Sequence, residues 1–210
     1  FGLLTGGSVG ICGASAAMAI AAVLPQSEER EKQVVFTVLT VTTLSTIAMI
    51  VYPVIATQLD FDSKEAGLFL GGTILDLAQV VGSGYSVSTA TGDFATITKL
   101  CRVLLLLPVF LTVVWVFRDE QGKAGPLPLP WFILGFVACM LLASFDVLAQ
   151  PVTDFGLALS KLLLVMAIAA LGMKSNPRIL FRGSLPALTL VVAETLLLGS
   201  LILIWLLIQR

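Results

Sequence analysis

Five ionisable side chains lie inside otherwise apolar runs of this sequence. They are Asp76, Lys99, Arg102, Lys161 and Glu194. A charge within a membrane segment costs several kcal/mol unless it is paired or hydrated, so each of these residues indicates a partner or a functional site. Three of the five are basic and two are acidic, and this positive excess favours the binding of an anion.

The first polar group surrounds Asp76 in the run GLFLGGTILDLAQVVGSG. Thr73, Asp76 and Gln79 are three residues apart, which places them on one face of a continuous helix. Such a face points into the protein or into an aqueous cavity. Two interpretations remain open: a polar cluster that packs helices together, or a site for a coupling ion or a substrate.

Lys99 and Arg102 are also three residues apart, at the start of a long apolar run. Lys99 either extends to the membrane surface or supplies positive charge to a substrate. Arg102 is deeper and needs a partner, which is an anion, the carboxylate of Asp76 or backbone carbonyls.

Lys161 and Glu194 form an interhelical ion pair, or Glu194 faces a cavity, or Glu194 lies close to a basic group of another segment. Ser160, beside Lys161, is assigned with Thr73, Asp76 and Gln79 to the polar or coupling-ion site.

Glycine is concentrated near the start of the chain, in LLTGGSVGICGASAAMA. Each glycine costs a helix about 1 kcal/mol relative to alanine, so the cluster needs a reason. Close helix packing through small residues is one reason, and an interrupted helix whose freed N–H groups face an anion is the other. The second interpretation predicts non-helical backbone between Gly6 and Gly13. It assigns Gly10, Gly13 and Ser15, with Lys99 and Arg102, to a substrate-binding site.

The elements that carry these residues are predicted to be membrane helices. Hydrophobic residues form 58% of the 210 positions and charged residues 12%, against about 25% charged in soluble domains. We expect an all-α, multi-pass membrane protein that forms a single membrane domain over residues 1–210. Its seven apolar segments are Leu3–Leu24, Val34–Leu59, Ala66–Val81, Phe94–Phe117, Trp131–Leu148, Phe155–Met173 and Leu185–Leu207.

The distribution of Lys and Arg between the loops predicts the orientation. If every segment crosses the membrane, the loops after Val34–Leu59, Phe94–Phe117 and Phe155–Met173 collect six basic residues and lie in the cytoplasm. The other side then carries Arg30, Lys32 and Arg210. The chain starts in an apolar run at Phe1 with no signal peptide, so we expect further helices upstream.

Several classes of function are disfavoured. The sequence has no histidine, its three cysteines stand apart, and its net charge is −1. We expect no cofactor, no metal site and no nucleic-acid partner. A membrane enzyme is disfavoured because no paired carboxylates and no nucleophile–base pair are visible.

Six strings, in this order and spacing, carry a resemblance to a known family: GSVGICGASAAMA, TIAMIVYP, GLFLGGTILDLAQVVGSG, KLCRVLLLLPVFL, LPWFILGF and LLLVMAIAALGM. Through them the sequence resembles, from Phe1 to about Met173, the sulfate exporter family of bacterial inner-membrane proteins. The resemblance implies a secondary transporter of ten or eleven helices, of which this chain is about the C-terminal two-thirds. It also implies the inverted-repeat architecture of bile-acid symporters and sodium/proton antiporters. One departure is that Leu75 and Asp76 stand where the family usually has His-Glu.

From these observations we expect a secondary active transporter that exports sulfate or a related sulfonate or organic anion by alternating access. Sodium or a proton is the expected coupling ion, and a homo-oligomer is left open. The alternatives are a passive anion channel, which the scattered mixed charges disfavour, and a cation-coupled organic-anion symporter. Segments Leu3–Leu24 and Phe155–Met173 are predicted to cross near the midplane.

Overall fold

In the computed structural model, the regular secondary structure of the described residues is all α-helix. The structure describes residues 1–23, 27–117 and 185–209, together with residues 135, 138–139, 141–142, 151–156, 158–160, 162–163 and 166. The predicted segment Trp131–Leu148 and much of Phe155–Met173 therefore lie outside the described residues. The helices are α1 (Gly2–Gly10), α2 (Ala14–Val23), α3 (Glu28–Gln58), α4 (Ser63–Thr73), α5 (Leu77–Val87), α6 (Thr89–Leu104), α7 (Leu106–Phe117) and α10 (Leu185–Gln209).

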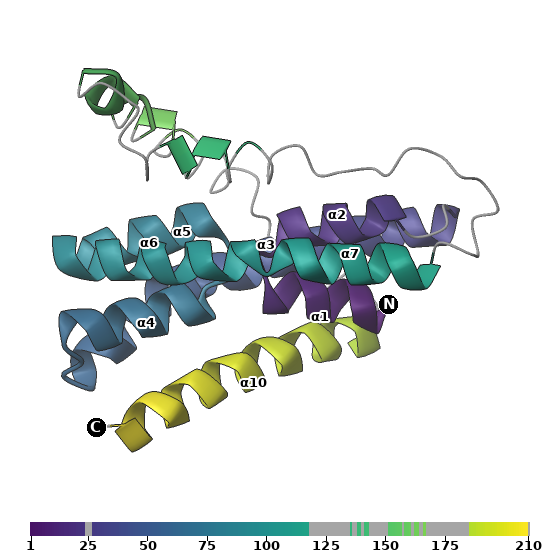
Figure 1. Cartoon of the computed structure of the whole chain (residues 1–210). Coiled ribbons are helices and arrows are strands. Elements are labelled where there is room, and N and C mark those ends of the chain that lie inside the picture. Colours follow the sequence, from purple (N-terminus) through teal and green to yellow (C-terminus); the bar gives the residue numbers. More distant parts are fainter. Residues whose placement is uncertain are drawn as a thin grey trace.

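Three of the described helical stretches are long and apolar enough to cross a membrane: Glu28–Gln58, Thr89–Val113 and Leu188–Gln209. The second of them runs from α6 into α7 with a local irregularity at Leu105. Pro108 accounts for this irregularity, because it has no N–H to donate to the carbonyl of Leu104. In Figure 1, α6 and α7 follow one another along the length of the molecule, and α10 runs along it below them.

The predicted interruption in the first segment is confirmed. The chain leaves the helix at Ile11 and re-enters it at Ala14. Gly13 has φ +62° and donates its N–H to the carbonyl of Ser8, a conformation that favours glycine. The two halves lie antiparallel, because Leu4 of α1 packs with Ala17 and Ile20 of α2. Residues 2–23 therefore form a hairpin.

The prediction of one continuous helix over Ala66–Val81 is wrong. Helix α4 ends at Thr73, residues 74–76 are extended or irregular, and α5 begins at Leu77. The reason is Asp76, whose carboxylate accepts a hydrogen bond from the N–H of Ala78 (2.9 Å) and so begins a second helix. Aspartate is a strong N-cap residue and a weak helix-interior residue. Thr73, Asp76 and Gln79 consequently do not share one helical face.

Helices α4 and α5 form a second hairpin against α6. A Cβ atom added to Gly67 of α4 would lie 3.0 Å from the N of Ala95, and one added to Gly84 of α5 would lie 2.9 Å from the Cα of Gly92. On α4 the next glycine, Gly71, approaches the carbonyl of Ala95. The three backbones thus approach one another through glycine, as small residues permit in membrane helices.

The two hairpins enter from opposite ends and meet at their tips (Figure 1). We call residues 11–13 and 74–76 the hairpin tips. A Cβ atom at Gly13 would lie 3.4 Å from the carbonyl oxygen of Leu75. The four half-helices have 9, 10, 11 and 11 residues, or about 13–17 Å each. This is about half of a 30 Å hydrocarbon core, so a hairpin of this length reaches from a membrane surface to about the middle of the core.

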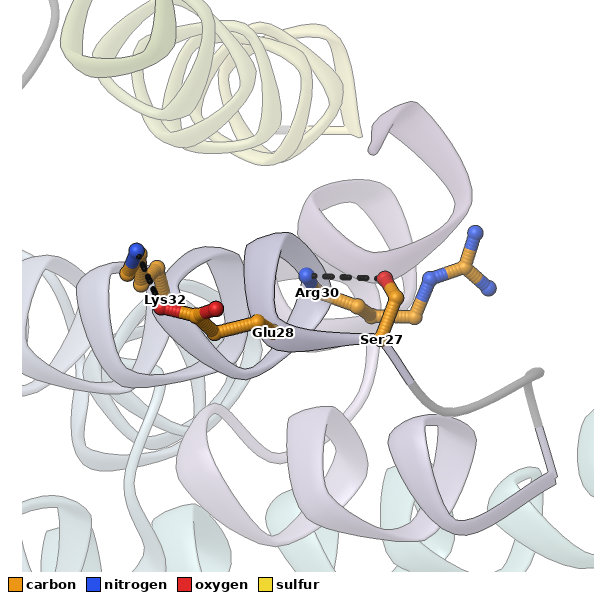
Figure 2. A network of polar contacts seen from close by, with 4 residues as sticks. All are labelled: Ser27, Glu28, Arg30 and Lys32. Atoms are coloured by element: carbon orange, nitrogen blue, oxygen red, sulfur yellow. Dashed lines mark hydrogen bonds and ion pairs between the residues drawn. The ribbon is translucent and has the colours of Figure 1, made fainter.

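Polar helix caps lie at the start of α3 and, just beyond the other end of α3, at the start of α4. Ser27 accepts a hydrogen bond from the N–H of Arg30, and Lys32 pairs with Glu28 at 2.9 Å on an exposed surface (Figure 2). At the other end Asp62 and Glu65 form a capping box at the start of α4. The charged residues at these turns are consistent with contact with water at the two membrane surfaces.

The hairpins change the predicted orientation. That prediction assumed that Ala66–Val81 crosses the membrane and thereby placed Lys64 on the same side as Arg118. In the structure α4 and α5 return to the end where they start, whereas α6 and α7 run to the other end, where α7 packs beside α2. Lys64 and the end of α7 at Phe117 therefore lie at opposite ends of the molecule. The predicted distribution of Lys and Arg between the two sides of the membrane no longer holds.

Cysteine labelling tests this topology. Ser63→Cys and Ala90→Cys, each exposed in the structure, should react with a membrane-impermeant maleimide from the same side of the membrane, in a background without the native cysteines. Ser27→Cys should react from the opposite side. Labelling of residues 63 and 90 from opposite sides would instead support a helix that crosses once.

Candidate functional site

Two basic side chains of α6 contact the hairpin tips. The Nζ atom of Lys99 donates hydrogen bonds to the carbonyls of Ile11 (3.0 Å) and Ile74 (2.9 Å). Each of these carbonyls lies where a half-helix ends. The Lys99 side chain has no exposed surface. One ammonium group thus holds the ends of α1 and α4 together.

Arg102, one turn further along α6, binds the same two helix ends. Its Nε atom donates to the carbonyl of Gly10 at 3.2 Å, and Nη2 donates to the carbonyls of Val9 (2.9 Å) and Gly10 (2.6 Å). Its Nη1 atom donates to the carbonyl of Gly72 on α4. Arg102 is half-buried, and its contact with exposed Gly10 lies toward the surface.

These contacts decide what the two cations do. The last carbonyls of a helix have no partner within the helix and carry about half a negative charge. Arg102 donates four of its five guanidinium N–H groups, and Lys99 two of its three ammonium N–H groups, to such carbonyls. Of the three partners considered for Arg102, the structure shows the carbonyls. Within the described residues neither Lys99 nor Arg102 pairs with Asp76.

Asp76 lies at the second tip and is fixed by α3. Its N–H donates to Ser45 Oγ at 3.1 Å, and its carboxylate caps α5 through one oxygen. Gln79, one turn into α5, donates from Nε2 to Thr46 Oγ1 at 2.9 Å. The sequence analysis missed Ser45 and Thr46. The signal was present as a run of hydroxyl residues at positions 37, 40, 42, 43, 45 and 46 of one apolar helix.

Further along α5 lie oxygen atoms for which the described part of the chain supplies no hydrogen-bond partner. They are Gln79 Oε1 and Ser83 Oγ, on side chains that are 2% and 1% exposed. The two residues are one turn apart on the same helix face. With Asp76 they form a row of oxygen atoms of the type that hard cations prefer.

The remaining predicted residues are placed differently. Thr73 is buried but donates its hydroxyl to the carbonyl of Phe69 in its own helix. Ser15 is exposed in the first turn of α2, and Ser160 is exposed in a separate stretch. The structure therefore brings together Gly10, Gly13, Asp76, Lys99 and Arg102, with Gln79 one turn away. Lys161 lies outside the described residues.

Removing the ammonium group should weaken the contact between the tips. Lys99→Met leaves the carbonyls of Ile11 and Ile74 buried without their donor, which costs about 1–3 kcal/mol for each group. Thermal unfolding in detergent should show a clear drop in Tm. Lys32→Met is the matched control, because an exposed ion pair contributes at most about 1 kcal/mol. Equal melting of the two variants would contradict the role assigned to Lys99.

Comparison with known proteins places the chain among bacterial membrane proteins. A UPF0324 membrane protein of Chlorobaculum tepidum is 50% identical over 207 residues, which cover 97% of this chain and 58% of that protein. The UPF0324 membrane protein TauZ of Paracoccus pantotrophus is 48% identical over 95% of this chain and 60% of its own length. TauZ of Paracoccus denitrificans is 46% identical with the same coverage.

The chain thus spans about three-fifths of the length of these curated relatives. No solved structure matches it. The match to a family model extends over residues 1–191 and includes both hairpins and Arg102. The chain belongs to the family described as Conserved hypothetical protein 698, whose relatives are the UPF0324 membrane proteins of bacteria.

Proposed function

We propose that this chain is part of a secondary active transporter that moves sulfate or a small sulfonate across the bacterial inner membrane. The observation that carries the proposal is the meeting of two half-length hairpins near the middle of the membrane, at Lys99 and Arg102. Interrupted helices at this depth are typical of the binding sites of secondary transporters. A protein that only needed stable membrane helices would have no use for four half-length helices that end at one place.

The exposed end of α1, next to the first tip, suits an anion. Gly10 is exposed, and a Cβ atom added there would meet nothing within 4 Å. Helix α2 begins four residues later, and the N-terminus of a helix attracts negative charge. Ser15 adds an exposed hydroxyl to its first turn. Arg102 keeps one N–H that the carbonyls do not use, so it contributes to binding chiefly by its charge.

The row of oxygen atoms on α5 supports a coupling cation. One carboxylate oxygen of Asp76 binds the N–H of Ala78, which leaves the other for a ligand. Gln79 Oε1 and Ser83 Oγ are unpartnered within the described residues. A cation here would neutralise Asp76 beside the anion site. This supports coupled transport over a passive channel, which needs a continuous pore lined with charge of one sign.

The relatives support a sulfonate as the solute. Two of them carry the name TauZ, which hints at a taurine-related membrane role. Taurine is a small sulfonate with an ammonium group, so it presents both charges for which the tips offer partners. Sulfate and taurine are therefore the two solutes to test first.

A matched pair of glycine variants tests the site in proteoliposomes that contain the natural protein. Gly10→Val places a side chain in the open space at the tip, and Gly2→Val places one in equally open space at the start of the same helix. We expect Gly10→Val to lose most uptake of labelled sulfate or taurine, while Gly2→Val retains it. Both variants should melt close to the unmodified protein.

Counterflow separates a transporter from a channel. Preloading the vesicles with unlabelled solute should accelerate uptake of the labelled solute. Uptake without this acceleration would favour a channel. Full uptake by Gly10→Val would contradict a solute-binding site at the tips.

A further inference from the structure

A second polar contact, which is partly buried, lies between the first hairpin and the long helix α10. Glu194 is the tenth of the 25 residues of α10 and the only charged residue of that helix. It is the seventh residue of the candidate span Leu188–Gln209, which places it about 10 Å into the apolar stretch. Its Oε1 atom lies 3.1 Å from Thr5 Oγ1 of α1.

The surroundings of Glu194 do not suit a carboxylate ion. Its Oε2 atom is buried and has no hydrogen-bond partner in the described part of the chain. Gly6, beside Thr5, presents no side chain, and a Cβ atom there would lie 3.7 Å from Oε1. An ionised carboxylate with one weak partner costs several kcal/mol in such a place.

Within the described residues Glu194 forms no ion pair. The elements that pack against α10 there are α1, α3, α4 and the second tip, where Leu75 packs beside Val191. Helix α1 has no charged side chain, and the titratable group beside Leu75 is an acid, Asp76. The titratable group of α3 nearest along α10 is the hydroxyl of Tyr52, which faces Gly199. Lys64 and Glu65 of α4 lie at the far end of α10, where Leu206 packs beside Ala66.

The hydrogen bonds are consistent when Glu194 is a neutral acid. The single hydroxyl proton of Thr5 has three acceptors within reach: Glu194 Oε1 at 3.1 Å, the carbonyl of Gly2 at 3.3 Å and the carbonyl of Phe1 at 3.5 Å. A carboxyl O–H that donates to Thr5 Oγ1 frees the Thr5 proton for the carbonyl of Gly2. Each donor then has one acceptor, whereas an ionised Glu194 competes with two carbonyls for one proton.

We propose that Glu194 is a reversible proton-binding site between α1 and α10, occupied in the state seen here. Glu194 Oε1 takes a proton from water and holds it against Thr5 while the first hairpin packs on α10. When α1 separates from α10, water reaches the carboxyl group and receives the proton. This site is distinct from the tips and does not depend on which solute the protein moves.

Carbodiimide labelling of the natural protein in membranes tests the proposal directly. Dicyclohexylcarbodiimide reacts with protonated carboxyl groups in apolar surroundings, and mass spectrometry of peptides locates the adduct. We expect modification at Glu194 in neutral buffer, a loss of modification in alkaline buffer, and none at the exposed Glu28 and Glu29. Thr5→Val should shift the loss of modification to a different pH, because it removes the acceptor of the carboxyl proton.

The amide variant supplies a second readout that does not need activity. Glu194→Gln imitates the neutral acid, so its Tm should match that of the unmodified protein and should no longer vary with pH in the range where labelling changes. Absence of labelling at every pH would overturn the proposal. Protection of Glu194 by sodium at constant pH would also overturn it, because a metal ion would then occupy the site.

An ion pair with Lys161 is the remaining alternative, and it has its own signature. In that case Glu194→Gln and Lys161→Met would each lower the Tm, and the double variant would lower it no further. That result would assign Glu194 to a structural pair and contradict proton binding.

Discussion

The structure depends on how backbone carbonyls are satisfied where helices end inside a membrane. In hydrocarbon no water is present to bind them, and each unsatisfied group costs several kcal/mol. Helices α1 and α4 both end at mid-depth, with their final carbonyls directed at α6. Lys99 and Arg102 provide the donors. Without these two side chains, the carbonyls of Ile11 and Ile74 would lose the donors that the described structure gives them.

The same constraint explains the arrangement of the other helices. Because α6 contacts both tips, α4 and α5 must lie along its first half, and α1 and α2 must approach it from the other end. The long helix α3 completes the tips through Ser45, whose hydroxyl receives the N–H of Asp76. A small apolar cluster of Val9, Val41, Leu75 and Val191 then joins α1, α3, the second tip and α10 at one place. Polar and apolar contacts therefore converge on the same level of the molecule.

Sequence alone predicted the membrane class and the interruption among the glycines of the first segment. It did not predict the second interruption, because Asp76 within an apolar run fits both a polar helix face and an N-cap. That choice depends on Ser45 of α3, more than thirty residues away. The partners of Lys99 and Arg102 were also beyond local patterns. The spacing of Lys99 and Arg102 predicts that their side chains point in a shared direction. It does not predict their partners, because backbone carbonyls belong to every residue type and become available here only when the two hairpins meet.

The glycines between α4, α5 and α6 have a mechanical consequence. At Gly67, Gly71, Gly84 and Gly92 the neighbouring atoms leave no room even for a methyl group, so these three helices cannot slide past one another without collision. Helices α3 and α10 meet this unit through larger and more yielding side chains, among them Tyr52, Ile202 and Leu203. Any large displacement within the membrane is therefore expected to carry α4, α5 and α6 as one rigid body along α3 and α10, with Lys99 and Arg102 travelling inside it.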